Sequence, residues 1–189
     1  MPSVRFTLVA AAFVTGLAGI ASAQPKPPET AAAKFSMSKE YRVVQQAALK
    51  SQRKLLLSFA DSMPEKLYRD RATPPQRSFS EQVHHIVSAN GMISSAFLAG
   101  PRAPAPDTAA VFNSRAGLKQ FINDTYDALD KLIAEQTDAE RDTPVKFFGN
   151  FIPKWQVWDE LNQHSMWTAG QIVANFRKNG MAPPSFLFF

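Results

Sequence analysis

The sequence predicts an all-α fold, an up-down four-helix bundle, and three observations lead to this prediction. Four long amphipathic patterns, in which apolar residues recur every three or four positions, succeed one another along the chain of 189 residues. Cysteine is absent, so the domain has to be held together without disulfides. The composition, 45% hydrophobic and 20% charged, is typical of a globular protein, and four such helices in one chain favour a bundle.

The first 23 residues have the features of a cleavable signal peptide. Arg5 precedes an apolar run, and Ala21-Ser22-Ala23 supplies the small residues of a cleavage site. The run is shorter than the roughly 18–20 apolar residues of a membrane span, so we expect no stable membrane span. We therefore expect a periplasmic or secreted protein, with a flexible lead-in over residues 24–37 and a folded domain over residues 38–189.

A proline-rich stretch separates the two N-terminal helices from the two C-terminal ones. The first pattern covers about residues 38–60. The second begins at a capping box, in which the side chains of Ser78 and Glu81 can satisfy the free amides of a helix start, and continues to about Ala99. We expect the proline-rich stretch 101–113 to be a linker, because proline inside a helix lacks the N–H donor and clashes.

The two C-terminal helices enclose a short connection. The third pattern covers about residues 114–136, and the fourth about residues 155–179, with Gly180 placed to end it in a left-handed conformation. Between them, residues 141–153 are expected to be a connection with a short extended piece. The final Phe-Leu-Phe-Phe, residues 186–189, is either a tail packed on the bundle or an exposed sticky end.

Helical geometry places two of the three histidines at the edge of the core. At about 100° per residue, His85 lies beside the apolar face of the second helix with Ala89 next to it, whereas His84 is expected to face solvent. His164 lies at the edge of the buried face of the last helix, with Gln171 just outside it. Ala89 and Gln171 would then line a pocket. A histidine at a core edge is usually a hydrogen-bonded structural residue, and two ligands fall short of the three that catalytic zinc takes from protein.

Two segments carry a family resemblance. Residues 77–90, RSFSEQVHHIVSAN, and residues 164–184, HSMWTAGQIVANFRKNGMAPP, resemble the signature regions of the DinB-like metal-binding four-helix family, the damage-inducible and bacillithiol-transferase-like superfamily. The resemblance covers nearly the whole chain after the signal peptide. It implies a divalent metal bound by three histidines, one from the second helix and two, one turn apart, from the last. By position these fall on His85, His164 and Thr168.

The third position departs from the family pattern. The neutral hydroxyl of Thr168 is a poor metal ligand compared with imidazole or carboxylate. Glu160, one turn before His164, either replaces the lost histidine, which would give a site suited to iron or manganese, or is an exposed carboxylate in the first turn of the helix. We expect a degenerate two-histidine site that binds zinc, nickel or iron weakly or not at all.

Three functions fit these residues, and the sequence assigns no catalytic residue. The first is a non-catalytic exported bundle that binds a small molecule. The second, which the resemblance implies, is a metal-dependent hydrolase or thiol S-transferase-like enzyme using His85 and His164 with Glu160 or water. The third is a structural or partner-binding module, and a homodimer stays open. Nucleic-acid binding is not expected, because the net charge of +5 is mild and no basic run is interleaved with aromatic residues.

Overall fold

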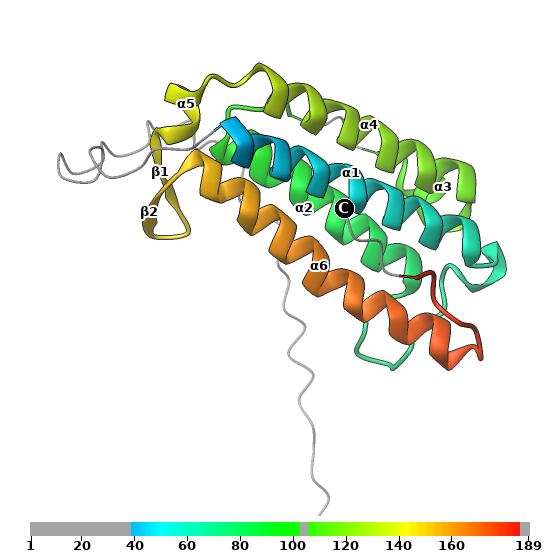
Figure 1. The fold of residues 1–189 in the computed structure, drawn as a ribbon. Helices are drawn as coiled ribbons and strands as arrows, with labels where there is room; N and C mark the ends of the chain where they lie inside the picture. The colour runs from blue at the N-terminus through cyan, green and yellow to red at the C-terminus, as the bar shows by residue number, and fades with distance from the viewer. Residues whose placement is uncertain (1–38, 103–105, 186–189) are drawn as a thin grey trace, which may run out of the picture.

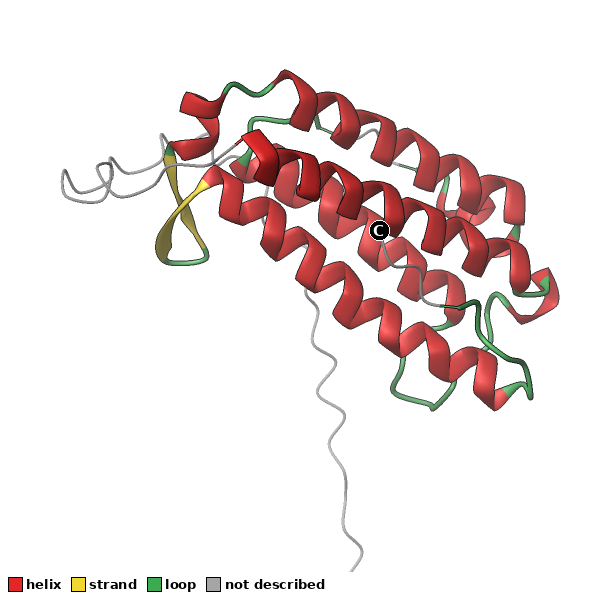
Figure 2. Cartoon of the chain, in the orientation of Figure 1, coloured by secondary structure: helices red, strands yellow, loops and turns green. Residues whose placement is uncertain are grey.

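Four long helices make up most of the chain that the computed structural model describes, residues 39–102 and 106–185. The helices are α1 (Lys39–Ser62), α2 (Phe79–Phe97), α4 (Arg115–Glu135) and α6 (Lys154–Lys178) (Figures 1 and 2). The predicted all-α bundle is confirmed. The expected signal peptide, the lead-in and the last four residues lie outside the described residues.

Helices α2 and α4 run in the same direction, so the helices do not alternate strictly up and down as the sequence predicted. Asn90 of α2 contacts Tyr126 of α4, and the carbonyl of Leu98, just after α2, accepts a hydrogen bond from Gln136, just after α4. Because the two helices end side by side, the chain between them has to return along the bundle (Figure 1). A helix of 21 residues is about 30 Å long, and the proline-rich connection covers this distance.

The proline-rich connection contains a short helix that the sequence did not predict. Helix α3 (Thr108–Asn113) begins after Pro106, and the Asp107 carboxylate accepts hydrogen bonds from the backbone amides of Ala109 and Ala110. The prediction of a linker without helix is therefore wrong for residues 108–113. A Cβ on Gly117 would lie 2.6 Å from the Ala110 backbone, so glycine allows α3 to pack closely on α4.

A helical turn and a hairpin connect α4 to α6. Helix α5 (Asp138–Asp142) is followed by the antiparallel strands β1 (Pro144–Phe147) and β2 (Asn150–Pro153). The turn residues Phe148 and Gly149 have φ values of 42° and 103°. The extended piece expected between residues 141 and 153 is thus a β-hairpin, and its second strand leads directly into α6.

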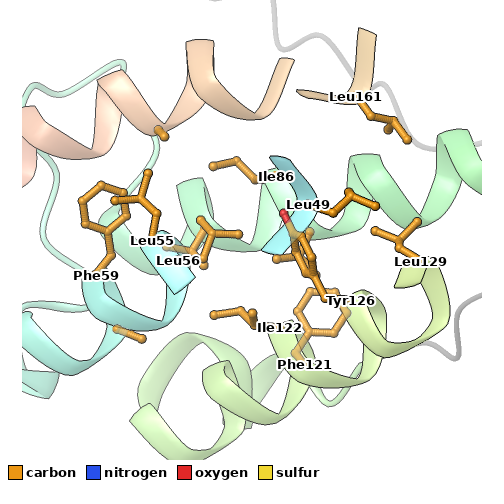
Figure 3. Packing of buried hydrophobic residues seen from close by; sticks show 14 of the residues in the cluster. Leu49, Leu55, Leu56, Phe59, Ile86, Phe121, Ile122, Tyr126, Leu129 and Leu161 are labelled. Carbon is orange, nitrogen blue, oxygen red and sulfur yellow. The ribbon is translucent and has the colours of Figure 1, made fainter. Parts of the chain in front are cut away.

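The core lies between the four long helices, and each contributes apolar side chains to it. Leu49 and Leu56 of α1, Ile86 of α2, Ile122 of α4 and Leu161 of α6 are all buried there (Figure 3). Burial of such side chains is the main favourable contribution to folding. Across the described residues, none of the helices combines the length and the apolar character of a membrane span.

Candidate functional site

The start of α2 sets the position of His85. Ser78 and Glu81 form the predicted capping box, in which the Ser78 backbone N–H donates to the Glu81 carboxylate at 2.8 Å and the Glu81 N–H donates to the Ser78 hydroxyl. Arg71 and Arg69 form ion pairs with the same carboxylate. The carboxylate is therefore fixed at the helix start, one turn before His85.

A buried polar contact aligns α2 with α6. The Asn90 side chain donates to the hydroxyl of Ser165 at 3.0 Å, and that hydroxyl donates back to the Asn90 oxygen at 3.2 Å. Both residues are almost fully buried. Because Ser165 directly follows His164, this pair of hydrogen bonds fixes the position of His164 along the bundle axis relative to α2.

The rings of His85 and His164 meet between the two helices, as the family resemblance implied. Their centroids are 5.2 Å apart, with an interplanar angle of 73°. Two imidazoles bound to one tetrahedral metal, with metal–nitrogen bonds of about 2.1 Å, have centroids roughly 5 Å apart. The Nδ1 atom of His164 is buried and has no hydrogen-bond partner among the described residues. The separation of this pair therefore suits a shared ligand.

Thr168 and Glu160 do not complete a three-ligand set. Thr168 follows His164 by one turn and is only 2% exposed, and Glu160 is partly exposed. Within residues 39–102 and 106–185, no three His, Cys, Asp or Glu side chains are grouped so that they could hold a metal ion. The described residues thus offer two imidazoles here, one fewer than the three protein ligands of a catalytic zinc site.

Gln171 of α6, two turns after His164, is hydrogen-bonded to α2 and to the segment before it. Gln82 of α2 donates to the Gln171 side-chain oxygen at 3.0 Å, and Gln76 donates to the Gln171 backbone carbonyl at 3.0 Å. Ala89, the other expected pocket residue, is partly exposed one turn after His85. The oxygen of the Gln82 side chain is buried without a hydrogen-bond partner in the described part of the chain. Gln171 therefore links α6 to both α2 and the segment before it.

His84 is half-buried against aromatic rings and not turned fully to solvent, which corrects the sequence prediction. Its ring stacks on Phe121 of α4 at 5.3 Å and contacts Phe112 of α3 edge-on at 5.0 Å. Burial lowers the pKa of His84. The prediction failed because α3, which supplies Phe112, was not expected. His84 is nevertheless turned away from the pair, so the two adjacent histidines differ as predicted.

Burial and one positive charge lower the pKa of both paired imidazoles. Burial is the larger cause and the charge of Arg77 the second, and together with His164 and His84 they lower the pKa of His85 to about 4. The pKa of His164 is lowered by the same two causes, in the same order. Sequence reasoning overlooked Arg77. This residue directly precedes the capping box at the start of α2, and His85 lies two turns further along the same helix.

Comparisons with known proteins agree with this fold. The crystal structure of a DinB-like protein from Bacillus cereus ATCC 10987 is similar, with a TM-score of 0.66 and 19% sequence identity over 81% of this chain and 100% of that chain. None of the curated proteins compared with the chain matches it significantly. The sequence pattern of the DinB superfamily matches residues 48–172, about two thirds of the chain. The chain belongs to the DinB superfamily.

Proposed function

We propose that this protein is an exported, non-catalytic member of the DinB superfamily whose His85–His164 pair binds a small molecule and has only weak affinity for divalent metal. The observation that carries this proposal is an intact imidazole pair without a third strong ligand beside it among the described residues. In the resemblance to the DinB-like family, the position of the third metal-binding histidine falls on Thr168. A metal held by two imidazoles lacks one of the three protein ligands of a catalytic zinc site.

Several features support a binding role for the pair. The pKa of both imidazoles is lowered, which favours the neutral form that accepts a metal or donates one ring N–H to a ligand. The buried Nδ1 of His164 is available to such a ligand, since no described residue bonds to it. A bound metal would supply a Lewis acid, and the chain's own residues supply the two imidazoles on rigid helices.

Export is the part of the proposal that rests on sequence alone. The apolar run that begins at Phe6 and the Ala21-Ser22-Ala23 site support a cleaved leader and a periplasmic or secreted location. The absence of cysteine means that this location would add no disulfide to the fold. Cell fractionation with N-terminal sequencing tests it, and a protein that stays in the cytoplasm with Met1 retained would contradict it.

The test of the metal site is metal analysis of the purified wild type beside Thr168→His, Thr168→Val and Glu160→Ala. We expect zinc or nickel well below one equivalent in wild type, a higher content in Thr168→His, and no change in Thr168→Val. Position 168 lies on the same face as His164, one turn away, where a histidine can share its metal. Since Thr168 is buried, thermal unfolding of each variant shows whether the larger side chain is accepted.

The opposite pattern would favour the enzymatic alternative, a metal-dependent hydrolase or thiol S-transferase-like activity. Full metal occupancy in wild type, unchanged in Thr168→His and lost in Glu160→Ala, would show that the carboxylate completes the site. Zinc titrations of His85→Ala and His164→Ala keep the test decisive if Thr168→His fails to fold. Residual zinc binding that survives both substitutions would place the metal elsewhere and overturn the proposal.

A further inference from the structure

A cavity lies on the side of α2 that faces α3 and α4, away from the histidine pair. It has a volume of about 360 Å³, and its apolar wall includes Val111 of α3 and Phe121 and Leu129 of α4. Phe121 and Leu129 are labelled in Figure 3. The histidine pair meets between α2 and α6, and neither of its residues lines the cavity. The cavity is therefore a second site, distinct from the pair.

The size of this cavity suits a small molecule of about two rings. Ligand cavities in proteins have volumes of about 300–1,000 Å³. A dry cavity of about 150 Å³ is large enough for one benzene molecule, and this cavity is more than twice that size. Small residues leave the space open, because Gly91, Ala110 and Ala128 line it from α2, α3 and α4.

One hydroxyl in the cavity wall has no hydrogen-bond partner among the described residues. Thr125 of α4 lines the cavity and is only 4% exposed, yet its hydroxyl bonds to no residue that the structure describes. Its oxygen is not fully enclosed by protein atoms, so it is open to the cavity. The hydroxyl of Ser94, also in the wall, already donates to the Gly91 carbonyl at 2.9 Å. Because a hydroxyl both donates and accepts, Thr125 favours a hydroxyl or carbonyl group on the bound molecule.

The charged residues of the cavity wall are exposed to solvent. These are Arg102, Asp107 and Asp124. The Asp107 carboxylate is already bonded to two backbone amides of α3, and Asp124 accepts a hydrogen bond from Gln120 at 2.6 Å. A charged group placed against the apolar wall would lose its hydration without gaining a buried counter-charge. The cavity therefore favours a neutral molecule.

We propose that this cavity binds a small neutral molecule of about two rings, and that the Thr125 hydroxyl forms a hydrogen bond with a single hydroxyl or carbonyl group of that molecule. Phe121, Val111 and Leu129 supply the apolar contacts for the rings. The proposal goes beyond the function proposed for the histidine pair and does not rest on it.

The chain's three histidines report which of the two sites is occupied. The ring of His84 stacks on Phe121 at 5.3 Å, and Phe121 lines the cavity. Nuclear magnetic resonance tracks the histidine ring signals while 2-naphthol, naphthalene or the charged 2-naphthoate is added to the purified protein. We expect 2-naphthol to shift the signal of His84 and to leave those of His85 and His164 in place. The carboxylate of 2-naphthoate should weaken binding at least about tenfold relative to 2-naphthol.

Substitutions in α4 separate the hydrogen bond from the cavity itself. Thr125→Val should weaken 2-naphthol binding about three- to tenfold and leave naphthalene binding unchanged, whereas Thr125→Ser should keep both. The melting temperature of Thr125→Val should not fall, because the hydroxyl has no partner to lose among the described residues. Ala128→Leu fills the cavity and should weaken both ligands more than about tenfold. Ala134→Leu is its matched control, since Ala134 is exposed on the same helix outside the cavity.

The opposite results overturn the proposal. A His84 signal that stays in place, or a shift confined to His85 and His164, would show that 2-naphthol does not occupy this cavity. Equal effects of Ala128→Leu and Ala134→Leu would place the bound molecule elsewhere. If Thr125→Val changes the binding of 2-naphthol and naphthalene to the same extent, or changes neither, the hydroxyl does not recognise the ligand and the assigned chemistry is wrong.

Discussion

Asn90 of α2 and Tyr126 of α4 are joined by a hydrogen bond of 3.2 Å in the interior of the bundle. The Tyr126 hydroxyl in turn donates to the side-chain oxygen of Gln52 in α1, and Asn90 also bonds to Ser165 in α6. One chain of buried polar groups therefore contacts all four long helices. Such a network is favourable only while every member has a partner, and it allows few alternative alignments of the helices.

Tyr126→Phe is expected to destabilise the bundle by about 1–3 kcal/mol, because it leaves the buried oxygen of Gln52 without a donor. Urea unfolding measures the change. Tyr68→Phe is the matched control: its acceptor, the carbonyl of Ala60, also accepts a hydrogen bond from Arg115, so its loss should be smaller. Equal losses in the two variants would show that the network adds nothing beyond one hydrogen bond.

The adjacent histidines of α2 should respond differently to the same substitution. His84→Ala removes the ring contacts with Phe112 and Phe121 and should cost about 1–2 kcal/mol of stability while leaving zinc binding unchanged. His85→Ala should abolish the weak zinc binding at a smaller cost in stability. Zinc titration and chemical unfolding of both variants check this, and zinc binding that depends on His84 would contradict the assignment.

Two glycines of the C-terminal region should give opposite results on substitution by alanine. A Cβ on Gly170, inside α6, would meet no atom within 4 Å, so Gly170→Ala should stabilise the protein by about 0.5–1 kcal/mol. Gly180 ends α6 with a φ of 68°, as the sequence predicted, so Gly180→Ala should destabilise it by about 1 kcal/mol. Thermal unfolding measures both, and a shared sign would be inconsistent with this reasoning.

The carboxylate of Asp70 should make stability depend on acidic pH. Lys178 and then Asn179 lower its pKa below the ordinary value of 3.8, through hydrogen bonds of 2.7 and 2.8 Å. Because the folded pKa is lowered, the stabilisation is fully present above pH 3.8 and is lost as the pH falls through the folded value. The pair lies near the surface, so its contribution should be below about 1 kcal/mol.

Unfolding of wild type and Asp70→Asn between pH 2 and 7, a range of about five units, tests that dependence. The two proteins should differ at neutral pH and converge in acid. A difference that grows in acid would mean that the folded pKa of Asp70 is raised.

Sequence periodicity was sufficient to locate the long helices and to place His85 and His164 each at the edge of the core. Both results depend on local rules, because a turn of about 100° per residue and an S-x-x-E capping box act within a few residues of one another. The left-handed end of α6 at Gly180 is equally local. For such features the sequence carries the necessary information in a short window.

Contacts between distant segments could not be read in this way. The direction of α4 depends on whether the proline-rich segment spans the length of the bundle, and no local sequence pattern encodes this length. The side on which α3 packs decided the surroundings of His84, and the hydrogen bond from Gln76 to the Gln171 carbonyl joins two segments far apart in the sequence. The angular position of a residue on its own helix does not show which other segments pack against it.

The parallel course of α2 and α4 has a consequence for the order in which the chain can acquire structure. Helix α1 packs against α4 and α6, and so does α2, whereas the consecutive helices α1 and α2 make few contacts with each other. The first half of the polypeptide therefore has no self-sufficient helical hairpin that could form early. Its apolar faces gain partners only once α4 has been made and are fully covered only by α6, so we expect folding to be a late event dominated by sequence-distant contacts.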